Sequence, residues 1–244
     1  MNVRRTLATT SRVLLQVRHD PRTVGLLLIV PSALIGLVAW IFADTGVFDY
    51  IGPAMIALFP FVMMFVITSI TTLRERQSGT LERLLALPTS NLDFILGYTI
   101  AFGLLAIVQS AVIVGFAVWV CGLEIEGSMW LLLAVTISDA VLGTALGLLA
   151  SAFAQTEFQA VQFMPAFVFP QILLGGVFLA RETMPDVLHA ISDWLPLSHA
   201  IDALNAVARD TEDAGYIGVK LLIVGAFIVG SIVLGAITLR RRTP

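Results

Sequence analysis

The chain has 244 residues, of which 58% are hydrophobic and 13% are charged, against roughly 25% charged in a typical soluble domain. It contains several apolar runs of about 20 residues, the length that crosses the hydrocarbon core of a bilayer. The composition therefore indicates a polytopic membrane protein. The formal net charge of −3 says little, because the side of the membrane on which each charge lies is what matters.

Single residue types exclude several kinds of site. The only lysine, Lys220, follows a valine, whereas a phosphate-binding loop needs a lysine after glycine to reach the phosphates. Any ATP hydrolysis that powers this protein must therefore take place in another chain. The only cysteine, Cys121, excludes an internal disulfide and a Cys-x-x-Cys pair, and the three histidines form no zinc motif. We expect no metal site, no cofactor and no catalytic residue in this chain.

Residues 1–22 are predicted to begin with an amphipathic helix at the membrane interface. Its apolar face contains Val3, Leu7, Thr10, Leu14 and Val17. Arg5 and Arg12 lie opposite, where arginine side chains reach water from the headgroup layer. The segment 19–22, His-Asp-Pro-Arg, then breaks the helix.

Six segments are predicted to span the membrane as α-helices, which makes the fold class all-α and polytopic. They are 24–43, 53–73, 94–121, 129–154, 158–179 and 216–239. Gly143, Gly147 and Ser151 form a stripe of small residues that lets a second helix approach closely. Pro165 and Pro170 are expected to bend the fifth span.

Two groups of polar residues lie inside these spans. Hydroxyls gather at the end of the second span, at Thr68, Ser69, Thr71 and Thr72. They either line a polar entrance or bond back to carbonyls one turn earlier. Asp139 lies near the middle of the fourth span, where an ionisable group costs roughly 2.5–3.5 kcal/mol to insert. It is either a candidate intramembrane polar site, for a proton or cation, or a structural residue that is protonated or hydrogen-bonded to Ser138, Thr136 or a neighbouring helix.

The segment 183–209 contains two amphipathic pieces, Pro185–Trp194 and Ser198–Arg209, separated by Leu-Pro-Leu. Each piece is too short to cross a bilayer. We expect a re-entrant helical hairpin at the outer membrane surface, between the fifth and sixth spans.

The segment 74–90 is a charged island between two apolar spans. Leu81, Leu84 and Leu85 follow an i, i+3, i+4 spacing, which places them on one face of a short helix. Gly79 and Thr80 suit its start, and a proline at position 88 ends it. The pattern predicts a short helix just outside the membrane.

This island resembles the cytoplasmic loop of the type-2 ATP-binding-cassette (ABC) permeases, the membrane subunits of one class of ABC exporter. The matching residues are Glu75, Gly79, Thr80, Leu81, Glu82, Leu85 and Pro88. A second match to the same family follows the fifth span, at Gly175, Phe178, Met184, Pro185, Leu195, Pro196 and Leu197. The resemblance implies that the island is a coupling helix that docks on a separate ATPase subunit.

The resemblance further implies a complex and a transport path. The permease would pair with a second copy of itself or with a homologue, and the partner ATPase would bind ATP and Mg²⁺. The residues expected to contact the ATPase are Glu75, Gly79, Thr80, Leu81, Glu82, Leu84, Leu85 and Pro88. Candidates for the wall of the path between the two membrane subunits are Phe59, Met63, Phe65, Thr68, Phe163, Phe167 and Phe169. Their aromatic and sulfur-containing side chains favour an amphipathic substrate such as a drug, an antibiotic or a lipid.

The basic residues predict the orientation. With the amino terminus inside, eleven of the 14 basic residues lie in cytoplasmic segments and three, Arg181, Arg209 and Lys220, lie on the other side. The positive-inside rule therefore places both termini and the coupling loop in the cytoplasm. Arginine is far more frequent than lysine, which suggests a bacterial protein and hence the plasma (inner) membrane of a bacterium.

Other classes of function remain open from the sequence. The main rival is a transporter or channel that works without ATP and uses Asp139 as a proton or ion site. A membrane enzyme is a weaker alternative, because the polar residues do not converge on a reaction, and a membrane assembly factor is another.

Overall fold

A computed structural model of the chain describes residues 3–77 and 91–238, which form helices and connecting loops without a strand. The all-α class is therefore confirmed for the described part of the chain. The α-helices are α1 (Val3–Arg18), α2 (Pro21–Ile41), α3 (Val47–Gln77), α5 (Asn91–Gly115), α6 (Met129–Phe153), α7 (Glu157–Leu174), α8 (Asp186–Ser192), α9 (Pro196–Arg209) and α10 (Ala214–Thr238). A short π-helix, η1 (Phe116–Val120), continues α5, and a 3₁₀ turn, η2 (Arg181–Thr183), precedes α8.

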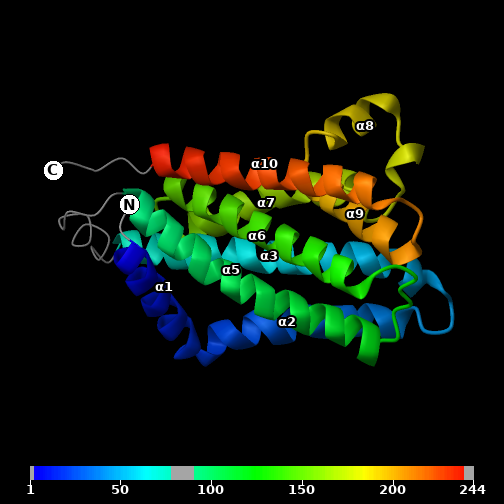
Figure 1. Ribbon diagram of the computed structural model, residues 1–244, viewed down its shortest axis with the longest axis horizontal. Helices are drawn as coiled ribbons and strands as arrows, with labels where there is room; N and C mark the ends of the chain where they lie inside the picture. The colour runs from blue at the N-terminus through cyan, green and yellow to red at the C-terminus, as the bar shows by residue number, and fades with distance from the viewer. Residues whose placement is uncertain (1–2, 78–90, 239–244) are drawn as a thin grey trace.

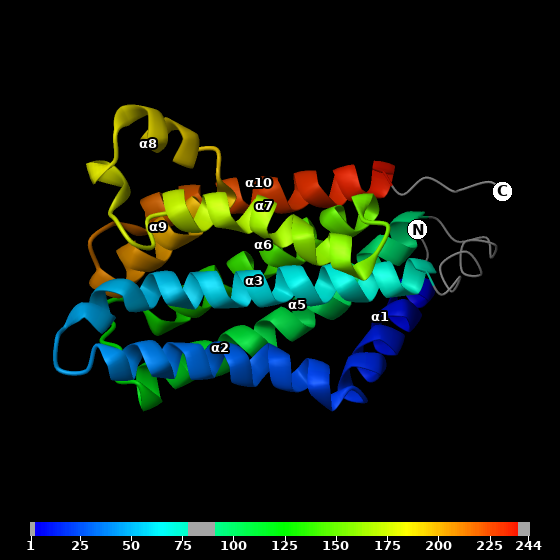
Figure 2. The same ribbon diagram turned by 180° about the vertical axis from the view of Figure 1, so that it is seen from behind.

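The long helices α2, α3, α5, α6, α7 and α10 run lengthwise beside one another as a bundle (Figures 1 and 2). At one end, which we call the loop end, α3 ends, α5 begins, α10 ends and α1 lies obliquely across the bundle (Figure 1). The opposite end, which we call the hairpin end, contains α8 and α9. The described ends of the chain therefore lie at the same end of the bundle.

Within the described residues, five helices are long and apolar enough to cross a membrane: α2, α3, α5 with η1, α6 and α10. The expected fifth span, 158–179, is not among them. Its helix, α7, ends at Leu174 and contains one glutamate, three glutamines and two prolines in 18 residues. These polar residues lower its hydropathy, and a turn with Gly176 at a positive φ of 87° follows its end. A sixth span, at 158–179, therefore stays a prediction, while five are supported by the length and composition of the described helices.

The closest helix packing in the bundle lies between α3 and α6 and uses the predicted small residues of α6. A Cβ atom at Gly143 would lie 2.3 Å from the carbonyl oxygen of Phe61, and one at Gly147 would lie 2.5 Å from that of Phe65. The two backbones are thus in direct contact, which only glycine permits.

The helix α1 ends at the expected break, but its faces differ from the prediction. The carboxylate of Asp20 caps α2 by accepting from the backbone N–H groups of Arg22 and Thr23 at 3.1 and 3.3 Å. Hydrogen bonds from Thr23 lower the pKa of Asp20. The bundle-facing side of α1 contains Thr6, Thr10, Val13 and Val17. Leu7 is exposed, and Arg12 points into the bundle instead of toward water.

The hairpin segment folds as two helices with different surroundings. The longer one, α9, packs against α3, α6 and α10, and its Leu197, Ile201 and Leu204 are fully buried. Its first turn is capped from α7, because the side-chain oxygen of Gln171 accepts from the N–H of Leu197 at 3.1 Å. α9 is therefore part of the protein interior. The shorter helix, α8, projects to the side of the bundle (Figures 1 and 2).

Candidate functional site

One arginine joins three helices at the loop end. Nη1 of Arg12 in α1 donates to both carboxylate oxygens of Glu75, at 2.9 and 3.0 Å, and Nη2 donates to the hydroxyl of Tyr98 at 3.0 Å. Glu75 lies in the last turn of α3, and Tyr98 lies about two turns into α5. Arg12 therefore ties the helix before residues 78–90 to the helix after them.

The carboxylate of Glu75 is largely withdrawn from water, whereas its partner Arg12 is partly exposed. The side chain of Glu75 is 7% exposed and that of Arg12 is 36% exposed. Burial acts to lower the pKa of Arg12, but Tyr98 and Glu75 outweigh it and raise that pKa. The guanidinium is therefore charged throughout the physiological range, and its hydrogen bonds are of the stronger, charge-assisted kind.

Close backbone contact between α1 and α5 supports this arginine. The hydroxyl of Thr10 donates to the carbonyl oxygen of Gly97 at 3.1 Å. A Cβ atom at Gly97 would lie 2.7 Å from Cβ of Thr9 and 3.1 Å from the carbonyl oxygen of Thr6. Because a larger residue at position 97 would push α1 away, Gly97 is required for Arg12 to reach α3 and α5 together.

The residue before Glu75 makes a second connection, to α7. Arg74 donates from Nε and Nη2 to the two carboxylate oxygens of Glu157, at 2.7 and 3.0 Å. This paired geometry fixes the orientation of the two side chains. Both are exposed, at 60% and 45%, so the pair contributes only about 0.2–1 kcal/mol to stability. The pair holds the end of α3 next to the start of α7, because Glu157 lies in the first turn of α7.

We call Arg12, Arg74, Glu75, Tyr98 and Glu157 the loop-end junction. Two consecutive residues at the end of α3 bind α1 and α7, and α1 also binds α5. A displacement of the last turn of α3 must therefore move α1 and α7 with it or break these contacts.

The sequence matches the ABC-2 type transporter family model over residues 4–208. The chain belongs to the ABC-2 type transporter family. Members of this family are membrane components of ABC transporters, so the loop-end junction is part of a permease.

Three relatives illustrate the similarity. The permease is 28% identical over 159 residues to ABC transporter G family member 20 of Dictyostelium discoideum. It is 27% identical over 153 residues to the probable multidrug ABC transporter permease YbhR of Escherichia coli, and 25% identical over 180 residues to the probable multidrug ABC transporter permease YbhS of the same organism. The matched regions cover 65%, 63% and 73% of this chain but only 22%, 42% and 47% of these relatives.

Of the residues that the sequence assigned to ATPase coupling, Glu75 is in the described part of the permease. It lies in the junction, bound to Arg12. The other seven, Gly79, Thr80, Leu81, Glu82, Leu84, Leu85 and Pro88, lie outside the described residues, so their role stays a prediction.

The candidate path residues divide into two groups. Phe65 of α3 and Phe163 and Phe167 of α7 form an aromatic cluster, with ring centroids 6.4 Å apart for Phe65–Phe167 and 6.3 Å apart for Phe163–Phe167. Within this chain Phe65 and Thr68 are fully buried, whereas Phe167 and Phe169 are exposed. The remaining candidates, Phe59 and Met63, are partly buried. α7 therefore presents part of the set at the surface, and α3 keeps part of it inside.

Asp139 lies fully buried in α6, and neither of its carboxylate oxygens has a hydrogen-bond partner among the described residues. The expected bonds to Ser138 or Thr136 are absent, because both hydroxyls donate to carbonyl oxygens one turn back. The hydroxyls of Thr68, Ser69 and Thr72 are also buried without a partner in this part of the permease. They do not bond back to their own helix, so the polar-entrance alternative stays open.

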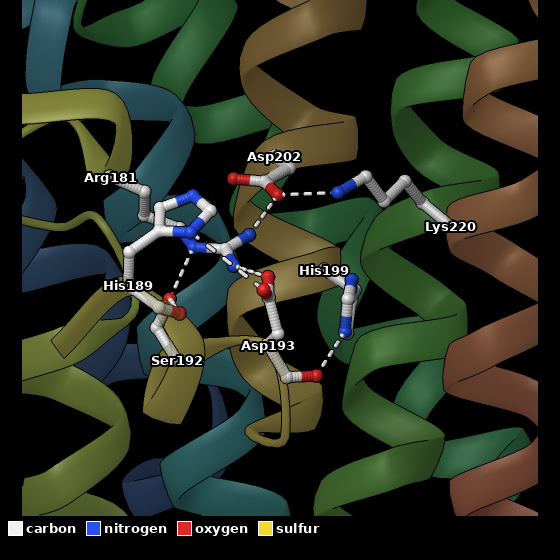
Figure 3. Close-up of polar contacts among 7 residues, drawn as sticks. All are labelled: Arg181, His189, Ser192, Asp193, His199, Asp202 and Lys220. Atoms are coloured by element: carbon white, nitrogen blue, oxygen red, sulfur yellow. Dashed lines mark hydrogen bonds and ion pairs between the residues drawn. The ribbon is translucent and has the colours of Figure 1, made fainter. Parts of the chain in front are cut away.

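A second group of polar residues, at the hairpin end, was not singled out from the sequence (Figure 3). Arg181 is 4% exposed; it donates to Ser192 Oγ at 2.8 Å and to the carboxylates of Asp193 and Asp202. Lys220 of α10 donates to Asp202 at 2.7 Å. We call these five residues the hairpin-end cluster. They tie η2, α8 and α9 to α10.

Two histidines, His189 and His199, lie beside this cluster. Nε2 of His199 lies 2.9 Å from the carbonyl oxygen of Asp193, and burial lowers the pKa of the ring, so we assign a neutral ring that donates from Nε2. Nδ1 of His189 lies 3.7 Å from the Asp193 carboxylate. No group of three or more potential metal ligands occurs among the described residues. The hairpin-end cluster is therefore an ion-pair network.

One sequence signal points to the charged residues of the two groups. In a chain with few charges, each charged residue beside or inside an apolar segment needs a partner, because an unpaired charge is costly there. Arg12, Arg74, Glu157 and Arg181 are such residues. The signal indicates that partners exist, but it does not identify them.

Proposed function

We propose that this chain is the membrane permease subunit of an ABC exporter, driven by ATP hydrolysis in a separate ATPase subunit. The observation that carries the proposal is the loop-end junction. Arg74 and Glu75, just before the loop that resembles a coupling helix, are bound to α7 and to α1 respectively. A force applied to that loop would thus reach three helices through side-chain contacts, in addition to the backbone of α3 and α5.

In this proposal the ATPase binds ATP and Mg²⁺, and the permease contributes no ATPase residue. Closure of a pair of ATPase subunits would push the loop of residues 78–90 toward the membrane. The ends of α3 and α5 would move first, and α1 and α7 would follow through Arg12 and Glu157. The sequence has no lysine after glycine that could bind phosphate, which supports the assignment of ATP hydrolysis to the separate ATPase subunit.

We further propose that the loop end faces the cytoplasm of a bacterium and that the hairpin end faces outward across the plasma (inner) membrane. Arg4, Arg12, Arg18, Arg22 and Arg74 lie on segments at the loop end. Arg181, Arg209 and Lys220 lie on η2, at the end of α9 and near the start of α10, segments toward the hairpin end (Figure 1). This asymmetry supports the orientation through the positive-inside rule.

A second permease and an amphipathic substrate complete the proposal. α7 has several exposed apolar residues, among them Phe158, Phe169 and Leu173, and such a face needs lipid or another chain beside it. We place a second copy, or a homologous permease, against this face, with the path between the two. The cluster of Phe65, Phe163 and Phe167 would then border the path and favour a drug, an antibiotic or a lipid-like substrate.

Co-purification and ATPase activity test this function. The permease is expressed with the ABC ATPase encoded nearest to its gene and purified through a tag on the permease, and ATP hydrolysis is measured. We expect the ATPase to copurify and to be stimulated by amphipathic compounds. The double variant Gly79→Pro/Glu82→Arg should lose the ATPase or its stimulation.

Glu124→Arg provides the matched control, because it reverses an exposed acidic residue at the hairpin end. It should leave both copurification and stimulation unchanged. If no ATPase associates while the permease alone moves solute or ions in liposomes, the exporter proposal fails.

Asp139 motivates the one rival function that we retain, an ion- or proton-coupled transporter that works without ATP. A fully buried carboxylate without a partner among the described residues is costly unless it takes up a proton or a cation. The rival predicts that Asp139→Asn abolishes transport in liposomes that contain the permease alone. The exporter proposal predicts no transport there in either variant.

A further inference from the structure

A cavity of about 150 Å³ lies at the hairpin end of the permease. Its wall is formed by the start of α3, the segment between α7 and α8, α9 and the start of α10. These segments lie together at the end of the bundle away from the two termini (Figure 1). The wall includes the exposed Tyr50, Glu182 and Glu212 and the buried Arg181 and Ala206, so the cavity leads inward from the surface. A cavity of this volume holds a molecule about as large as benzene.

The cations of the wall are engaged within the permease. Arg181 and Asp202 belong to the hairpin-end cluster, in which the guanidinium binds two carboxylates and Lys220 also donates to Asp202 (Figure 3). Arg209 donates from Nη2 to the carbonyl oxygen of Tyr50 at 3.1 Å, and its guanidinium carbon lies 4.6 Å from the centre of the Tyr50 ring. An anion in the cavity would have to compete with these contacts.

The hydrogen-bond acceptors of the wall are not engaged in this way. The carboxylates of Glu182 and Glu212 make no ion pair or hydrogen bond with the described residues. The side-chain oxygen of Asn205 is buried, also without a partner in that part of the chain, and a buried acceptor is unfavourable until a donor reaches it. A half-turn about the Cβ–Cγ bond exchanges the amide oxygen and nitrogen, which turns this oxygen toward the cavity.

These free groups indicate the charge of a ligand. Arg209 is the wall cation that has no carboxylate partner among the described residues, and it is outnumbered by Glu182 and Glu212. Asp210 and Asp213, in the turn before α10, add negative charge beside them. An ammonium group carries the complementary charge and donates three hydrogen bonds. A metal ion fits less well, because the described residues contain no group of three or more potential metal ligands.

We propose that this cavity, which we call the amine pocket, binds a small organic cation with one or two ammonium groups, such as a short aliphatic diamine. Glu182 and Glu212 bind the ammonium groups, and the side-chain oxygen of Asn205 accepts a hydrogen bond from one of them. The amine pocket shares no residue with the loop-end junction or with the candidate path. The site therefore goes beyond the proposed function and does not rest on it.

Calorimetric titration of the purified permease with putrescine, in neutral detergent and at low salt, tests the proposal. We expect weak binding, with a Kd of about 0.1–1 mM, because exposed charges contribute little each. Glu182→Gln and Glu212→Gln should each raise Kd about two- to fivefold. Added salt should also raise it, because it screens exposed charges. The matched control is Glu124→Gln, which neutralises an exposed glutamate at the same end but outside the wall and should leave Kd unchanged.

Two further ligands test the sign of the charge. Butane-1,4-diol has the same carbon chain as putrescine without its charges, and succinate carries two negative charges. Neither should bind. Binding of succinate in place of putrescine would show that the arginines determine the ligand, and equal binding of the diol would show that charge does not; either result overturns the proposal.

A cavity-filling variant tests where the cation binds. Ala180 lines the cavity, so Ala180→Leu should raise the Kd for putrescine about tenfold or more. An unchanged Kd in Ala180→Leu, or in both glutamine variants, would contradict the amine pocket, as would the absence of putrescine binding. Each variant is first checked for an unchanged Tm, and the glutamine substitutions preserve side-chain volume at exposed positions. Because the titration uses the permease alone, its failure leaves the exporter proposal intact, and a failure of the ATPase to copurify leaves the amine pocket intact.

Discussion

Replacement of Arg12 by methionine tests the central contact of the loop-end junction. Methionine preserves most of the aliphatic stem and removes the guanidinium that binds Glu75 and Tyr98. Loss of one partner costs about 3–5 kcal/mol in a fully buried pair and about 0.2–1 kcal/mol in an exposed pair. Glu75 is 7% exposed and Arg12 is 36% exposed, so we expect an intermediate loss of about 2 kcal/mol.

Thermal unfolding in detergent measures this loss. For a chain of this size, a change of about 2 kcal/mol lowers Tm by about 4–8 °C. Arg74→Met is the matched control, because Arg74 lies one residue from Glu75 but makes an exposed pair; it should lower Tm by no more than about 2–4 °C. In the complex with its ATPase, Arg12→Met should also hydrolyse more ATP per substrate transported.

The double variant Arg12→Met/Glu75→Gln decides whether the pair itself is responsible. Removal of both charges leaves no buried carboxylate without its arginine. The double variant should therefore lose about 1 kcal/mol less free energy of unfolding than the sum of the losses in the two single variants. If the single effects simply add, the ion pair does not couple α1 to α3. If Arg12→Met is no more harmful than Arg74→Met, the reasoning from burial is wrong.

Three further substitutions give clear expectations. Gly143→Leu should lower Tm by several degrees, because its Cβ would lie 2.3 Å from the carbonyl oxygen of Phe61; Gly225→Leu, with open space around it, should not. Asp139→Asn should retain ATP-driven transport and Tm under the exporter proposal, since it replaces a buried carboxyl by a neutral group of the same size, and transport assays with the ATPase present check this. Arg181→Met should cost about 2 kcal/mol, because it leaves the half-exposed Asp193 without its guanidinium and Asp202 with Lys220 alone; a fall in Tm of less than about 4 °C would contradict that.

The sequence predicted those features of the fold that depend on long apolar runs. Such runs identify membrane spans because the bilayer requires about 20 apolar residues and internal satisfaction of every backbone group. The sequence also predicted close helix packing on the small-residue stripe of α6, since glycine at four-residue spacing in an apolar helix lets another helix approach closely. α7 is the element for which the signal of a long apolar run is weakest, because its glutamate, glutamines and prolines limit its hydropathy.

The partners of the charged residues were not predictable in the same way. Arg12 binds Glu75 and Tyr98, which are 63 and 86 positions away in the sequence. One periodic pattern placed Arg12 on the water-facing side of an isolated helix. That pattern describes α1 as an isolated helix, whereas the position of α5 determines which side of α1 faces the bundle. The close approach of α1 to Gly97 of α5 fixes that side, and no feature of residues 1–22 predicts this contact.

One helix, α7, connects the loop-end junction to α9 through side-chain hydrogen bonds at both of its ends. Its first turn binds Arg74 through Glu157, and near its last turn Gln171 caps the first turn of α9. A shift of α3 at the loop end therefore reaches the hairpin end along α7, provided that the helix moves as one body. Proline cannot donate a backbone hydrogen bond, so Pro165 and Pro170 leave two gaps in the hydrogen-bond ladder of α7. Those gaps make the second half of α7 the place where an applied movement either bends the helix or passes on to α9. The aromatic cluster at Phe163 and Phe167 lies just before and between these prolines, so bending there would change the face that we assign to the substrate path.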